Sequence, residues 1–141
     1  MVTEAPLTHP EPGVIMAETR NYMRQIEAIA EANGSFRPEA YLFVLEALEK
    51  AMSDRGKRGH VTGEILLESI KLLGQDRYGV MATDVFAAWG VRSTLDFGRA
   101  VFHLISGGIL SRRNEDSLRD FIDKFDFRQV FEEEYFLRSE A

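Results

Sequence analysis

Residues 38–52 read PEAYLFVLEALEKAM, and this stretch decides the fold. Pro38 carries the backbone angle that the first turn of a helix needs. Tyr41, Leu42, Leu45 and Leu48 follow the three- and four-residue spacing of a buried helix face. Further apolar side chains flank this stripe, so the helix is apolar over most of its circumference. We therefore expect it to be the central helix of the molecule.

The sequence on either side of residues 38–52 predicts four more helices. They cover residues 14–32, a segment that begins after Thr62, residues 80–89, and residues 94–105. Asn33-Gly34 is a stop signal, and Thr62 and Ser93 are suitable N-caps. The predicted fold class is mainly α, a compact bundle of about five to six helices. The expected domains are a flexible N-terminal arm over residues 1–13, a single helical domain over 14–125, and an acidic, aromatic C-terminal helix or tail over 126–141.

The composition narrows the function classes. The chain has 141 residues, 45% of them hydrophobic, and no cysteine, which excludes disulfides and thiolate metal sites. No apolar run is long enough to cross a bilayer, so we expect a cytoplasmic protein without a membrane partner. The net charge of −6 divides into −4 over residues 1–53, +3 over 54–113 and −5 over 114–141. The chain as a whole should therefore repel polyanions.

The third to fifth predicted helices follow the order of a winged helix-turn-helix. Residues 90–93 form the short, glycine-containing turn, and two weak strand patterns at 109–112 and 118–121 predict a β-hairpin as the wing. In this alternative the protein is a nucleic-acid-binding regulator. Its contact residues would be Arg92, Arg99, His103, Arg112 and Arg113. Asp96, in the centre of that face, and the overall acidity argue against it.

No pattern of catalytic or metal-binding residues is present. His9, His60 and His103 are too far apart in the sequence for a zinc motif, and the chain has none of the common nucleophile or phosphate-binding motifs. The glutamates at 132–134 are typical of a solvated helix face. We therefore expect no catalytic residue, no cofactor and no metal, and a protein that is not an enzyme.

The C-terminal segment carries an aromatic stripe that allows two interpretations. Helical spacing of four residues joins Phe127, Phe131 and Tyr135, and Phe136 follows directly after Tyr135. The favoured interpretation is that the segment folds back and completes the core, because monomers rarely expose large apolar patches. In the other, the four side chains are an interaction surface for a protein partner or a second copy of the chain. Because the chain has no catalytic pattern and its C-terminal segment is rich in aromatic residues, the best functional hypothesis is a protein-interaction or adaptor module.

A set of short motifs between residues 41 and 127 resembles a family of conserved proteins from planctomycete- and verrucomicrobia-type bacteria. The motifs are Tyr41 to Leu48, His60 to Glu64, Tyr78-Gly79, Met81-Ala82, Trp89 to Val91, Asp96 to Gly98, Val101-Phe102, Asp120-Phe121 and Phe125 to Phe127. No activity, ligand or partner is established for that family, so the resemblance implies no functional residue.

Overall fold

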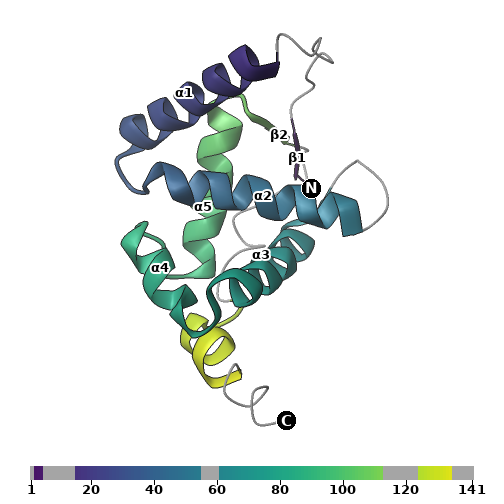
Figure 1. The fold of residues 1–141 in the computed structure, drawn as a ribbon, viewed down its shortest axis with the longest axis vertical. Helices are drawn as coiled ribbons and strands as arrows, with labels where there is room; N and C mark the ends of the chain where they lie inside the picture. Colours follow the sequence, from purple (N-terminus) through teal and green to yellow (C-terminus); the bar gives the residue numbers. More distant parts are fainter. Residues whose placement is uncertain (1, 5–14, 55–60, 113–123, 135–141) are drawn as a thin grey trace.

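The computed structural model describes residues 2–4, 15–54, 61–112 and 124–134, and within these ranges it is mainly helical (Figure 1). This confirms the predicted fold class. The elements are β1 (Val2–Glu4), α1 (Ile15–Asn33), α2 (Pro38–Asp54), α3 (Gly63–Tyr78), the short 3-10 helix η1 (Gly79–Met81), α4 (Ala82–Ala88), α5 (Thr94–Ser106), β2 (Leu110–Arg112) and the π-helix η3 (Arg128–Glu133).

Helix α2 is the centre of the bundle. It packs against α1, α3 and α5, and Figure 1 shows it crossing in front of α5 with α1 and α3 on opposite sides. Tyr41, Val44 and Leu48 have no exposed surface. Each fully buried side chain of this size contributes roughly 1.5–3 kcal/mol of hydrophobic stabilisation. The apolar circumference predicted for this helix is therefore covered from several directions.

The helix ends follow the capping signals of the sequence. The Thr62 hydroxyl accepts a hydrogen bond from the Ile65 amide at 3.1 Å, and the Ser93 hydroxyl accepts one from the Asp96 amide at 3.4 Å. The carboxylate of Asp96 accepts from the amide of Arg92 at 2.9 Å. These bonds satisfy amides that have no partner inside the helix.

The turn between α4 and α5 is fixed by a glycine against the α1–α2 connection. Gly90 has a φ of 94°, and a Cβ on it would lie 2.5 Å from the carbonyl oxygen of Ser35. The amide of Arg37 donates to the carbonyl oxygen of Trp89 at 3.0 Å. The end of α4 is thereby held beside the start of α2, which positions Trp89.

The strand after α5 has a different partner from the predicted one. β2 pairs antiparallel with β1, with Val2 opposite Arg112, whereas the predicted hairpin joined 109–112 to 118–121. Residues 118–121 lie outside the described residues. Val2–Glu4 is therefore a strand, where the sequence predicted a flexible arm, and the remainder of that arm lies outside the described residues. Pairing over such a sequence distance leaves no local signal.

The described part of the C-terminal segment folds back onto the domain. Phe127, Val130 and Phe131 are buried in the same core as α2. Gln75 of α3 donates to the carbonyl oxygen of Val130 at 3.1 Å. Phe127 and Phe131 are thus not an exposed docking stripe, because their rings complete the core. Tyr135 and Phe136 lie outside the described residues.

Candidate binding pocket

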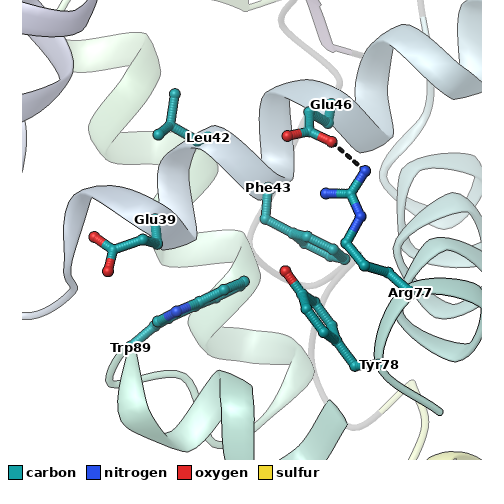
Figure 2. Close-up of a pocket in the computed structure, with 7 residues that line it drawn as sticks. All are labelled: Glu39, Leu42, Phe43, Glu46, Arg77, Tyr78 and Trp89. Carbon is teal, nitrogen blue, oxygen red and sulfur yellow. Dashed lines mark ion pairs between the residues drawn. The ribbon is translucent and has the colours of Figure 1, made fainter.

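A small pocket opens where α2 meets the ends of α3 and α4. It encloses about 160 Å³. Its lining, drawn in Figure 2, consists of Glu39, Leu42, Phe43, Glu46, Arg77, Tyr78 and Trp89. The four residues from α2 are spaced three, one and three apart, which places them on one face of the helix. Tyr78 is the last residue of α3, and Trp89 follows the last residue of α4.

Three aromatic rings form the apolar part of the pocket. The centroid of Phe43 lies 6.0 Å from that of Tyr78 and 5.6 Å from that of Trp89. Tyr78 and Trp89 meet edge to face, with centroids 5.9 Å apart. Phe43 is buried, whereas Tyr78 and Trp89 are half-buried and reach the surface. Below them, Phe86 packs against all three rings. The rings are therefore held in place by the core itself.

The polar rim of the pocket is acidic. The carboxylate of Glu46 pairs with the guanidinium of Arg77 at 2.6 Å, and that of Glu39 pairs with Arg37 at 3.2 Å. The hydrogen bond that Arg77 donates to Glu46, more than the charge of Glu46, raises the pKa of Arg77. Glu39, Glu46 and Arg77 give the lining a net charge of −1. An apolar floor with a few polar groups above it is the usual form of a binding site.

The structure describes part of the predicted nucleic-acid face. Arg92 and Arg99 are exposed, but Arg99 forms an ion pair with Asp96 at 3.1 Å. Arg112 ends β2, and Arg113 lies outside the described residues. The cationic groups of this surface are therefore partly neutralised by their own helix.

His103 belongs to that face only in the nucleic-acid alternative, and the structure shows it half-buried. Its ring turns inward, where Nδ1 shares a hydrogen bond of 2.8 Å with the hydroxyl of Tyr41. The ring of Phe36 lies against both, with centroids 5.7 Å from His103 and 6.1 Å from Tyr41. Burial raises the pKa of Tyr41 to about 12, and burial followed by the charge of Arg99 lowers the pKa of His103. The pair consequently joins α2 to α5.

Among the residues that the structure describes, no three histidine or carboxylate side chains come together as a metal site would require. No helix there has the length and apolar character that crossing a bilayer requires. His9 and His60 lie outside the described residues.

No family model, curated protein or solved structure matches the chain. The pocket is therefore identified by its geometry. In the sequence, Tyr78 and Trp89 stand out only as members of the resemblance motifs, and no pattern assigned a binding role to Glu39, Phe43 or Arg77. The available signal was the position of Trp89, the one tryptophan of the chain, directly before a turn glycine.

Proposed function

We propose that the protein is a non-catalytic protein-interaction module that binds its partner through the pocket between α2, α3 and α4. One observation carries this proposal: a tryptophan, a tyrosine and an arginine converge at one concave place on the surface. These three residue types are enriched among the residues that dominate binding energy in protein interfaces. Since Phe43 and Phe86 back the rings, little side-chain freedom is lost when a partner binds.

The nucleic-acid alternative has weaker support. A basic patch is the usual electrostatic mark of such a surface. Here Arg99 is paired with Asp96, His103 is turned inward, and the chain has a net charge of −6. A partner polypeptide suits these charges better than a phosphate backbone does.

A displayed peptide library tests the proposed function. The library is selected against the full chain, and the peptides obtained are measured against Leu42→Arg, which fills the mouth of the pocket. Leu72→Arg is the matched control, because Leu72 is 43% exposed on α3 and does not line the pocket. We expect Leu42→Arg to weaken binding about tenfold or more, as the loss of one well-packed contact does, and Leu72→Arg to leave it unchanged.

The localisation of binding provides a second check. Amide chemical shifts of the wild-type chain should move on α2 near Phe43 and around Trp89 when a selected peptide is added. Equal binding to both arginine variants, or shifts confined to another face, would show that the pocket is not the interaction site.

A further inference from the structure

We infer that the pocket accepts an organic ammonium group, carried by a lysine or methylated lysine of the partner. This inference deepens the proposed function and rests on it. Three features of the pocket support it independently: the aromatic faces, the charge of the rim, and the volume.

The aromatic rings offer a surface that attracts cations. A cation within about 6 Å of a ring centroid is drawn to the negative face of the ring, most strongly for tryptophan. The rings of Phe43, Tyr78 and Trp89 have pairwise centroid distances of 5.6–6.0 Å. The rings lie against one another at these distances, so a group in the pocket rests on the accessible surfaces of Tyr78 and Trp89 and not between the rings. Figure 2 shows the three rings close together in the lining of the pocket.

The charges around the rings favour a cation as well. Glu39 and Glu46 lie two helical turns apart on the same face of α2, about 10 Å along its axis. Arg77 is engaged by Glu46, and the exposed pair of Arg37 and Glu39 is of the kind that contributes little to stability. Tyr78 also marks the C-terminal end of α3, which carries partial negative charge. An ammonium group that displaces Arg37 can therefore pair with the carboxylate of Glu39 in the lining of the pocket.

The volume of the pocket fits the tip of one side chain. Sites for whole small molecules enclose about 300–1,000 Å³. The pocket encloses about 160 Å³ and opens to solvent. A methylated ammonium fits this space, while the alkyl chain behind it passes out along Leu42, the aliphatic member of the lining.

Binding of choline measures the cation preference directly. The control ligand is dimethylbutanol, the neutral isostere in which carbon replaces the quaternary nitrogen. Fluorescence reports on the pocket without labelling, because Trp89 is the chain's one tryptophan. We expect saturable binding of choline at least about fivefold tighter than that of its isostere. Equal affinity for the two ligands, or no saturable change with choline, would overturn the inference.

Charge-neutralising variants identify the rim residues. Glu39→Gln should weaken choline binding about two- to fivefold, and Glu46→Gln should weaken it more, because it also releases Arg77 toward the guest. Glu31→Gln is the matched control, since Glu31 is exposed on α1 and does not line the pocket. All three sites are on the surface, so the variants should keep the wild-type melting temperature. Identical choline affinities in all three variants would contradict the inference.

The peptide selection separates this inference from the proposed function. Peptides that bind the pocket should contain a lysine whose replacement by norleucine removes binding, and trimethylation of that lysine should preserve it. If pocket-binding peptides tolerate norleucine, the module stands and the cation preference is wrong. If choline binds and no peptide is selected, the pocket serves a small quaternary ammonium compound and both the interaction module and the lysine assignment are wrong.

Discussion

His103 shows how one neighbour changes the role of a residue. The nucleic-acid alternative places it on an exposed helix face, whereas in the structure its ring is half-buried and hydrogen-bonded to Tyr41 of α2 at 2.8 Å. Sequence periodicity cannot register this contact, because 62 positions separate the two residues. The half-buried imidazole is therefore a structural group whose charge opposes folding.

The lowered pKa of His103 predicts acid sensitivity. The unfolded histidine titrates near pH 6.5. Because burial lowers the folded value, the unfolded chain binds the proton more strongly, and the stability present above about pH 6.5 is lost as the pH falls through the folded pKa. Urea unfolding at about pH 7.5 and about pH 5 should show a larger loss for the wild type than for His103→Gln. The other two histidines are common to both proteins, so an equal loss would exclude His103 as the source.

Gly90 and Gly34 together separate the cost of a left-handed backbone from the cost of a steric clash. Both have positive φ, but a Cβ on Gly34 would meet nothing within 4 Å, whereas one on Gly90 would lie 2.5 Å from the Ser35 carbonyl oxygen. The left-handed backbone alone costs about 1–2 kcal/mol for a residue other than glycine. Gly34→Ala should cost about that much, and Gly90→Ala clearly more, in urea unfolding. Equal costs would mean that the close approach to Ser35 contributes nothing.

Among the elements, η3 depends most on tertiary packing. It is a π-helix, and its buried residues fill a surface over α3 and α4. Gly74 of α3 allows the approach, since a Cβ there would lie 3.0 Å from Phe131. The sequence supported the backfolded segment through its aromatic stripe, but the π-helical form depends on contacts that lie far away in the chain.

Loss of the η3 ring should destabilise the whole domain. Phe131 has no exposed surface, so Phe131→Ala should lower the free energy of unfolding by about 3–5 kcal/mol. Arg128→Ala, on the same element with its side chain 82% exposed, should change it by less than about 0.5 kcal/mol. Truncation after Lys124 should be at least as damaging as Phe131→Ala. A shortened protein of unchanged stability would show that η3 contributes nothing to the core.

The ends of the helices were predictable and the pairing of the strands was not. Thr62, Ser93 and Gly34 act locally, and their signals placed the helix boundaries within one or two residues. The partner of β2 comes from the other end of the sequence, and the pocket combines side chains from three helices. Neither arrangement leaves a periodic trace in one segment. The exposure of Leu72 has the same cause, because the position of the neighbouring helices decides which apolar side chains of α3 are covered.

Across the whole molecule, local stability against opening should be highest in α2 and lower in the elements at the periphery. Helix α2 is covered by α1, α3 and α5, whereas β1 and β2 form a sheet of two three-residue strands, too small to be stable alone. Hydrogen exchange should therefore be slowest for amides of α2 near Val44 and fast for those of β1 and β2. Amides of α2 that exchange as fast as those of the sheet would contradict a central role for α2.

The position of α2 in the chain also has a consequence during synthesis. Its apolar circumference leaves the ribosome with α1 already made but well before α3 and α5 can cover it, since α5 is completed about fifty residues later. At about 5–20 residues per second, this helix waits from a few seconds to about ten seconds for its neighbours. During that interval the apolar surface of α2 is open to binding by a chaperone. Slow translation between residues 61 and 106 would prolong this exposure.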